Sequence, residues 1–459
     1  MTKYKAYPEY KDSGVEWLGE VPKSWGIFKL KFGLSEPLVY GANESALDDN
    51  PENPRYIRIT DMNSNGTLRD DTFKSLPKII AKPYMLIDED ILLARSGATV
   101  GKSFYYKSIF GASCFAGYLI RARFSCDKII SRFAYWFFQS SIYWQYINAS
   151  QIQATIQNVS AEKYSDLYLS VPQEYTEQVR IVNFLDHETA KIDSLIEKQQ
   201  QLIELLKEKR QAVISHAVTK GLNPNVPMKD SGVEWLGEVP EHWIVSGFKK
   251  YLSSIVDYRG KTPNKTDDGI LLVTARNIKK GELDYTLSQE FIAPSDYKEV
   301  MSRGLPDIGD VLFTTEAPLG EVANVDRVDI ALAQRIIKFK GMISRLNNYY
   351  FKYFIMSSSF QQSLNLYSSG STAQGIKAER FVYLRKLLPP INEQRKIVDF
   401  LDKEISKIDI LVEQQFVMLS LLQERRTALI SAAVTGKIDV RDWVAPDSQE
   451  TDKTEETTA

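Results

Sequence analysis

The stretch KDSGVEWLGEVP, at residues 11–22 and again at residues 229–240, decides how the chain is organised. Twelve consecutive identical residues, with a tryptophan in each copy (Trp17 and Trp235), identify the chain as a tandem repeat. Two further blocks recur at nearly the same offset. EQVRIVNFLD at 177–186 matches EQRKIVDFLD at 393–402, and ISHAVT at 214–219 matches ISAAVT at 430–435. The chain therefore holds two copies of one unit.

Between the shared blocks lie two stretches, residues 23–170 and 241–388, that hardly match each other. Weak similarities survive: DILL at 90–93 pairs with DVLF at 310–313, and TIQNV at 155–159 pairs with TAQGI at 372–376. A common fold with diverged side chains is the pattern of a protein that recognises two different sites. Duplication followed by neutral drift is the alternative, but it does not explain why 12 residues stay identical beside near-complete divergence.

The composition excludes several classes of protein. With 459 residues, 43% of them hydrophobic and 25% charged, the chain fits a globular protein of two domains. It contains no apolar run long enough to span a membrane, and its first residues lack the apolar core of a signal peptide. Two cysteines, Cys114 and Cys126, fit a reducing compartment, so we expect a cytoplasmic protein. Three scattered histidines without a CxxC pair argue against a zinc site, and no metal site is expected.

The net charge of −2 conceals a division along the chain. Residues 22–170 carry a net charge of +3 and residues 240–390 one of +4, whereas residues 445–459 carry −4. That acidic, Thr/Glu-rich tail has no large apolar residue and is predicted to be disordered. The mildly basic modules permit contact with phosphates without demonstrating it.

Residues 176–219 are predicted to form one long helix, and the matching stretch of the second copy to form another. Apolar residues recur at heptad a/d spacing, prolines precede both stretches, and Gly221 and Gly436 supply C-terminal stops. The predicted helix seam consists of Ile192, Leu195, Gln199, Leu202, Leu206, Ile408, Leu411, Gln415, Met418 and Leu422. Some 40 residues at ~1.5 Å each make a rod of roughly 60 Å.

The two rods are expected to pack as an antiparallel coiled coil with one module at each end. The alternative, that each rod contacts a partner helix independently, stays open. Gln199 and Gln415 occupy the same seam position, where a polar residue commonly fixes register. Equally, each could lie at the solvated edge of the seam.

Each divergent stretch is predicted to be an α+β module. Short β-rich runs alternate with turn clusters, and one aromatic helix follows at residues 133–146, matched by residues 349–366 in the second copy. Such an apolar helix is more often core than a surface for stacking bases.

Polar loops of the modules supply the candidate DNA-binding residues. Gln and Asn pair with adenine, and Arg with guanine, in the major groove. The competing interpretation is ordinary loop chemistry, in which these residues only cap and turn. The candidates are Arg58, Asn63, Arg95, Ser96, Lys102, Gln153, Thr155, Gln157 and Asn158 in the first copy, and Arg276, Asn277, Thr314, Thr315, Ser371, Thr372, Gln374 and Lys377 in the second.

Enzyme motifs are incomplete, so no catalytic residue is predicted. GATVGKS at 97–103 resembles a phosphate-binding loop, but Ser96 stands where the first glycine belongs, and the second copy has Glu321 near the place of Lys102. LPPI at 388–391 lacks the Asn or Asp before, and the aromatic residue after, that an amino-methylating site needs. No glycine-rich loop for S-adenosylmethionine and no repeated acid cluster is present.

Taken together, these motifs resemble the DNA-specificity subunit of Type I restriction–modification systems. The resemblance rests on the doubled SGVEWLGEVP followed by Trp25 or Trp243, on the doubled Pro–EQ–I–FLD entry into a long helix, on the IS.AVT helix ends, and on the DIL-type strand. It implies an α+β tandem pseudo-twofold repeat of two α/β target recognition domains separated by two long helices that form an antiparallel coiled coil. The implied segments are residues 1–22, 23–170, 171–227, 228–240, 241–388, 389–444 and 445–459.

The resemblance also implies a function. Each module would recognise one half of a bipartite, asymmetric double-stranded DNA sequence, and the helices would set the spacing. Two modification subunits binding S-adenosylmethionine would methylate adenine, and restriction subunits using ATP and magnesium would translocate and cleave DNA, while this chain would catalyse nothing and bind no cofactor. The rival interpretations are a stand-alone two-site regulator, a nuclease or methyltransferase acting alone, and a coiled-coil scaffold without sequence preference.

Overall fold

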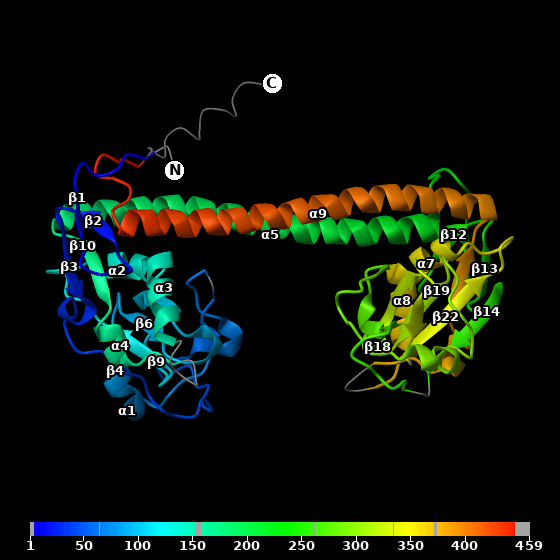
Figure 1. Cartoon of the computed structure of the whole chain (residues 1–459), viewed down its shortest axis with the longest axis horizontal. Coiled ribbons are helices and arrows are strands. Elements are labelled where there is room, and N and C mark those ends of the chain that lie inside the picture. The colour runs from blue at the N-terminus through cyan, green and yellow to red at the C-terminus, as the bar shows by residue number, and fades with distance from the viewer. Residues whose placement is uncertain are drawn as a thin grey trace, which may run out of the picture. The chain divides into compact units, whose positions relative to one another are not determined.

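The computed structural model describes residues 4–63, 65–151, 158–259, 262–333, 335–370 and 374–445 (Figure 1). It divides into two compact units, one formed by Met1–Gln200 with Val417–Ala459 and the other by Gln201–Phe416. Each unit combines one module with half of both long helices, α5 (Tyr175–Lys220) and α9 (Ile391–Val434). The compact units therefore differ from the consecutive segments expected from the sequence. The predicted acidic tail, from residue 446 on, lies outside the described residues.

Module 1, residues 23–170, and the hairpin before it contain short strands, short 3-10 helices (η) and three α-helices after the sheet. In chain order these elements are β1 (Tyr10–Asp12), β2 (Glu20–Pro22), β3 (Trp25–Lys29), η1 (Leu30–Phe32), β4 (Val39–Tyr40), β5 (Arg55–Ile57), η2 (Ile59–Asp61), η3 (Asp70–Thr72), α1 (Lys78–Ala81), η4 (Lys82–Tyr84), β6 (Ile91–Ala94), η5 (Gly97–Thr99), β7 (Ser103–Tyr105), η6 (Ser108–Phe110), β8 (Ser113–Phe115), β9 (Leu119–Ala122), α2 (Ser131–Phe137), α3 (Ser141–Gln151), α4 (Ala161–Ser165) and β10 (Tyr168–Pro172).

Module 2, residues 241–388, and its preceding hairpin follow the same plan. The elements are β11 (Met228–Asp230), β12 (Glu238–Pro240), β13 (Ile244–Gly247), β14 (Leu252–Asp257), β15 (Ile270–Val273), η7 (Ala275–Asn277), β16 (Ile278–Lys279), β17 (Glu282–Leu283), β18 (Phe291–Ile292), η8 (Pro294–Asp296), α6 (Tyr297–Val300), β19 (Val311–Thr315), β20 (Leu319–Asn324), β21 (Ile330–Leu332), β22 (Ile336–Gly341), α7 (Asn348–Met356), α8 (Ser358–Tyr367), η9 (Ala378–Val382) and β23 (Arg385–Leu388).

The repeated twelve-residue block folds as the same antiparallel hairpin in both units, β1 with β2 and β11 with β12. In the first hairpin Asp12 accepts from Gly14 N at 2.9 Å, and the Ser13 hydroxyl donates to the carbonyl two residues further on at 3.0 Å. The equivalent Asp230 and Ser231 make the same two bonds, each at 3.0 Å. Identical sequence thus produces identical turn chemistry.

Both modules contain a four-stranded antiparallel sheet of one topology, in the order β4-β9-β6-β7 in module 1 and β14-β22-β19-β20 in module 2. Beside it, β5 pairs with β8 in parallel in module 1, and β15 pairs with β21 in parallel in module 2. The first and last strands of each module also pair, β3 with β10 and β13 with β23. The predicted α+β class and the shared fold of the two copies are confirmed.

The DIL-type motif is explained by a buried acid at the entry to an inner strand. Asp90 accepts from Ile87 N at 2.9 Å and pairs with Arg123 at 2.7 Å. In module 2, Asp310 pairs with Lys338 at 2.7 Å, and both side chains are almost fully enclosed. The acid is kept because it fixes the turn before the strand, and its cationic partner compensates the burial of its charge.

The predicted single aromatic helix is two helices in each module, α2 followed by α3 and α7 followed by α8. The break falls at Ser140 and Ser357. Each hydroxyl accepts from the backbone N–H three residues on at 3.3 Å, as an N-terminal cap of the second helix. The aromatic side chains of these helices are core, with Phe133, Phe137 and Phe354 fully buried.

Helices α5 and α9 pair antiparallel within each unit. In the first unit Asp193 of α5 binds Arg426 of α9 at 2.6 Å, and in the second unit Arg210 of α5 binds Asp409 of α9 at 2.8 Å. The two pairs are equivalent by the repeat, with the donor and acceptor helices exchanged. Neither helix, nor any other described helix, is long and apolar enough to cross a bilayer.

The seam follows heptad spacing, but four of the ten predicted positions are displaced by one residue. Ile192, Gln199 and Leu206 of α5, with Ile408, Gln415 and Leu422 of α9, are buried or half-buried. Four predicted seam residues are exposed instead: Leu195, Leu202, Leu411 and Met418. The residues that take their places in the seam are Ile203, which is buried, and Ile196, Val412 and Leu419, which are half-buried. Adjacent apolar residues satisfy both possible 3-4 alternations, so only packing selects one of them.

Each module is attached to the ends of both helices by matching hydrogen bonds. In the first unit the Ser431 hydroxyl of α9 accepts from Ser141 N at 2.8 Å, and in the second the Ser215 hydroxyl of α5 accepts from Ser358 N at 2.9 Å. The glutamine of the repeated EQ pair accepts from a module backbone N–H: Gln178 from Ile130 at 2.9 Å and Gln394 from Asn347 at 2.8 Å.

Module 2 also encloses a lysine that pairs with no acidic side chain in the described part of the chain. Lys386 of β23 is fully buried, donates from Nζ to Phe248 O at 2.5 Å, and lies over the Phe351 ring at 5.3 Å. Burial lowers the pKa of Lys386 to about 7. The equivalent residue of module 1 is the buried Ser170.

We predict that Lys386 makes stability rise with pH. The unfolded chain holds this proton up to about pH 10.5, whereas the folded chain releases it near pH 7, so deprotonation favours the folded state between these values. Relative to Lys386→Met, the wild-type free energy of unfolding should increase by roughly 2–4 kcal/mol from pH 7 to pH 10. Denaturant titrations at several pH values measure the difference, with the exposed Lys298→Met as the control. A difference independent of pH would contradict the prediction.

Candidate nucleic-acid interface

In module 1 three chain segments meet at the end of the inner strand β6. Arg95 donates its backbone N–H to Tyr118 O at 3.0 Å and accepts from Val159 N at 2.8 Å, while Ser96 and Asn158 form a β-bridge. We call Arg95, Ser96, Tyr118 and Asn158 the crossing site of module 1.

Module 2 repeats this backbone pairing at the end of the inner strand β19. Thr315 donates its backbone N–H to Arg335 O at 3.0 Å and accepts from Ile376 N at 3.0 Å, while Glu316 and Gly375 form the β-bridge. The crossing site of module 2 therefore consists of Thr315, Glu316, Arg335 and Gly375. One backbone arrangement presents two chemically different sets of side chains.

The side chains of the first crossing site include groups without a partner. The Arg95 guanidinium lies 4.6 Å from the centroid of the Tyr40 ring. Arg95 Nε and Asn158 Oδ1 are both buried and have no hydrogen-bond partner among the residues that the structure describes. Tyr118 is 65% exposed. The Arg95 guanidinium is a cation stacked on the Tyr40 ring, and the unpaired Arg95 donor and Asn158 acceptor lie at the same site. Such a site can bind a ligand that offers both a hydrogen-bond acceptor and a hydrogen-bond donor.

A cavity adjoins the crossing site in each module, at equivalent positions. In module 1 it has a volume of about 350 Å³ and is lined by Tyr118, Tyr56 and the loop that begins at Arg58. Burial raises the pKa of Tyr56, and its hydroxyl donates to Ala42 O at 2.7 Å, so the ring is a neutral wall. In module 2 a cavity of about 200 Å³ is lined by Arg335 and by the equivalent loop at Thr274.

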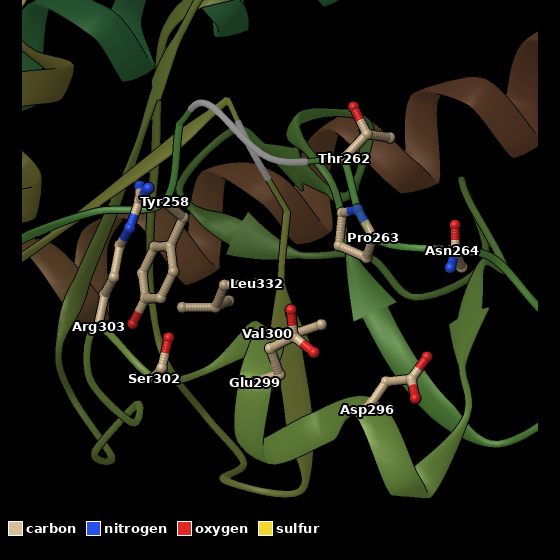
Figure 2. Close-up of a pocket in the computed structure, with 10 residues that line it drawn as sticks. All are labelled: Tyr258, Thr262, Pro263, Asn264, Asp296, Glu299, Val300, Ser302, Arg303 and Leu332. Atoms are coloured by element: carbon tan, nitrogen blue, oxygen red, sulfur yellow. The ribbon is translucent and has the colours of Figure 1, made fainter.

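A further cavity of about 340 Å³ in module 2 has a different chemistry (Figure 2). Its lining includes the carboxylates of Asp296 and Glu299, and its one arginine, Arg303, donates to the carbonyls of Asp257 and Arg259. Carboxylates repel phosphate, so this cavity is not part of the candidate interface. Among the described residues, no three His, Cys, Asp or Glu side chains are grouped to hold a metal ion.

Three predicted DNA contacts are corrected, because their side chains are enclosed and bonded. Asn277 is fully buried and accepts from Thr274 N at 2.9 Å while donating to Ser288 O at 2.8 Å. Thr314 accepts from a backbone N–H at 2.9 Å, and Thr315 lies at 2% exposure. These side chains fix loops and strands instead of presenting polar groups outward.

Arg58 is also held internally. It donates to Asp61 Oδ1 at 2.7 Å and to Thr72 O at 2.7 Å, so its guanidinium closes the loop at η2. Asp61 and the buried Asn277 are equivalent, since both accept from the backbone N–H three residues earlier.

The other predicted contact residues differ in accessibility. Asn63, Lys102, Arg276, Gln374 and Lys377 are exposed, and Arg95, Ser96 and Asn158 are half-buried at the crossing site. Gln153, Thr155, Gln157, Ser371 and Thr372 lie outside the described residues.

Sequence reasoning missed three residues of the interface: Tyr40, Tyr118 and Arg335. Tyr40 and Tyr118 are exposed aromatic residues beside Arg95, and Arg335 contributes the cation of the second crossing site. The available signal was weak: Tyr118 follows a glycine directly before a β-rich run. The pairing of residues 95 and 118 depends on strand contacts that no local pattern indicates.

The fold and the two crossing sites define a class of protein, a tandem-module binder whose two surfaces share a backbone and differ in side chains. A family model for the Type I restriction modification DNA specificity domain matches residues 41–205 and 252–415, which together are most of the chain and follow its two repeats. The chain belongs to this family, and the resemblance noted in the sequence is confirmed.

Individual relatives agree with the family match. The Type I restriction enzyme MjaVIII specificity subunit of Methanocaldococcus jannaschii is 21% identical over 429 residues, covering 92% of this chain and 94% of that protein. The StySPI specificity subunit of Salmonella potsdam is 29% identical over 230 residues, 47% of each protein. A solved chain from a study of complex assembly and conformational transition in the type I R-M system has a TM-score of 0.69 at 14% identity, covering 91% and 99% of the two chains. This likeness confirms the fold.

The enclosure of Asn277 predicts a structural effect on mutation. Asn277→Ala removes the side chain that joins Thr274 to two carbonyls, so stability should fall by about 1–3 kcal/mol. The exposed Asn63→Ala in module 1 should change stability by less than about 0.5 kcal/mol. Chemical denaturation of both variants checks the contrast, and equal effects would contradict it.

Proposed function

We propose that this specificity subunit recognises a bipartite, asymmetric DNA sequence, with one module for each half. The observation that carries the proposal is the crossing site, whose backbone pairing is the same in both modules and whose side chains differ. Two crossing sites with the same backbone pairing and different side chains suit two half-sites of different sequence. Family membership supports the same function and favours neither a stand-alone regulator nor a scaffold without sequence preference.

Electrostatics supports DNA as the ligand. The two modules carry net charges of +3 and +4, which attract the phosphate backbone without making the whole chain basic. The modest excess indicates that partner subunits share the phosphate contacts that supply much of the affinity. The exposed Lys102, Arg276 and Lys377 are candidates for contacts made by this chain.

The helices offer surfaces for partner subunits. Large apolar side chains are exposed along both of them: Leu195, Leu202 and Leu205 on α5, and Ile410, Leu411, Phe416, Val417, Met418 and Leu421 on α9. Exposed apolar side chains in such number are typical of a protein–protein interface. We assign this surface to two modification subunits, which bind S-adenosylmethionine and methylate adenine. Restriction subunits that use ATP and magnesium join the same assembly, and this chain directs them without catalysing a reaction.

The proposal is tested by expressing the chain with its cognate modification subunit in a host without adenine methylation. Long-read sequencing then maps methyladenine across the genome. A split motif with a fixed spacer, present only with this chain, is the expected result. Replacing residues 23–170 by those of a relative should change one half of the motif and leave the other unchanged. Methylation without a split motif would contradict the proposal.

We further propose that helix length sets the spacer between the half-sites. Deleting residues 200–206 and 416–422 removes one heptad from each helix and preserves the seam spacing and both Asp–Arg pairs. Seven residues correspond to ~10 Å of helix, so the spacer should shorten by about three base pairs. Mapped methylation should show the same two half-sites at the new distance. An unchanged spacer in an intact complex would refute the role of the helices as a ruler.

A further inference from the structure

We propose that Arg95 in module 1 and Arg335 in module 2 each recognise one guanine, in opposite halves of the DNA site. The assignment rests on the proposed function and names the side chains that carry part of the specificity. It follows from how the two arginines are held, by stacking on Tyr40 for Arg95 and by an ion pair with Glu316 for Arg335, and from the polar groups of the first crossing site that lack a partner among the described residues.

The side chain of Arg95 differs from those of the other arginines of module 1 in having no hydrogen-bond partner in the described part of the chain. Five other arginines of the module form ion pairs: Arg58 with Asp61, Arg69 with Asp71, Arg121 with Glu36, Arg123 with Asp90 and Arg132 with Asp186. Arg55 donates to Arg69 O at 2.6 Å. Arg95 Nε is buried without an acceptor among the described residues, as are Arg55 Nε and Arg121 Nε, but only Arg95 also leaves its terminal nitrogens without one. A buried donor without an acceptor is costly unless a ligand supplies one.

The Tyr40 ring holds the Arg95 guanidinium in place at 4.6 Å. Stacking on an aromatic face restricts the side chain before binding, so less freedom is lost when two parallel hydrogen bonds form. Guanine presents the two acceptors O6 and N7 on its major-groove edge, which match the two donors of an arginine.

Asn158 distinguishes a base from a phosphate as the ligand. No described residue donates to its buried Oδ1, and Asn158 is paired through a β-bridge to Ser96, the residue after Arg95. A phosphate offers only acceptors and leaves this oxygen unsatisfied, whereas the exocyclic amine of an adenine or cytosine satisfies it. The crossing site of module 1 therefore fits the edges of two neighbouring bases.

Module 2 presents its arginine from a different segment, the turn directly before β22. The equivalent of Arg95 is the buried Thr315, and the equivalent of Tyr40 on the sheet edge is Asp257. Arg335, the equivalent of Tyr118, supplies the cation instead, and Glu316 orients it through Nε at 3.0 Å. Among the described residues this is the one side-chain contact of Arg335, and it leaves the terminal nitrogens of a half-exposed guanidinium for a base edge. Each half-site then contains a guanine, contacted from a different segment.

The test uses the full chain in complex with its modification subunit. Variants Arg95→Gln, Arg95→Lys and Arg335→Gln are compared with wild type by genome-wide mapping of methyladenine. Arg69→Gln is the matched control, because Arg69 is an exposed arginine of module 1 already paired with Asp71. Thermal unfolding and co-purification with the modification subunit confirm that each variant folds and assembles.

We expect Arg95→Gln to lower the preference for guanine at one position of one half-site by about tenfold or more, and Arg335→Gln to do the same in the other half-site. Arg95→Lys should lose the preference to a similar extent, since lysine keeps the charge but not the paired donors. Arg69→Gln should leave the motif unchanged.

Two results would overturn the assignment. An unchanged motif in Arg95→Gln with normal assembly would exclude base recognition by this residue. A motif kept in Arg95→Lys, with methylation weakened uniformly at all sites in Arg95→Gln, would identify a phosphate contact instead. If the wild-type complex itself yields no split motif, the proposed function fails and the assignment falls with it.

Discussion

One fully buried tryptophan at the start of each module is the contact on which its unit depends. Trp25 donates from Nε1 to Glu177 Oε1 at 2.8 Å, and the Tyr7 hydroxyl donates to the same oxygen at 2.7 Å. The C-terminal glycine of the opposite helix closes over the indole, since a Cβ on Gly436 would lie 3.4 Å from Trp25 and only 2.2 Å from Pro22. Hairpin, module and two helix ends therefore meet at one side chain.

The second unit repeats the arrangement with a local change. Trp243 is fully buried beside Gly221, yet no described residue accepts a hydrogen bond from its Nε1. Glu393, the equivalent of Glu177, lies 2.8 Å from His242 Nε2 instead. Packing of the indole is common to both units, while the hydrogen bond is not. Burial of the large indole surface thus holds module and helix ends together in the second unit, although Trp243 lacks the hydrogen bond that Trp25 makes to Glu177.

The contacts that join each module to its hairpin and to the helix ends recur in both units, which explains how the modules diverge without losing their fold. The contacts that recur in both units are the hairpin turn, the capping serines, the buried acid before the inner strand and the glutamine of the EQ pair. All of them are made to backbone groups or enclosed charges. The groups that change, at the crossing sites, project from backbone already fixed by strand pairing. Recognition side chains can therefore be replaced without disturbing the hydrogen bonds of the sheet.

The sequence by itself determined the tandem repeat, the two long helices, the α+β class and the family, because these depend on long identical blocks and on periodicity. It could not choose between Leu195 and Ile196 for the seam, since both satisfy a 3.5-residue repeat. It also could not separate Asn277 from Arg95, although both are polar loop residues. Only the tertiary structure enclosed the side chain of Asn277 and left that of Arg95 without a hydrogen-bond partner among the described residues. Burial of a polar group depends on segments distant in the chain, and no local pattern carries that information.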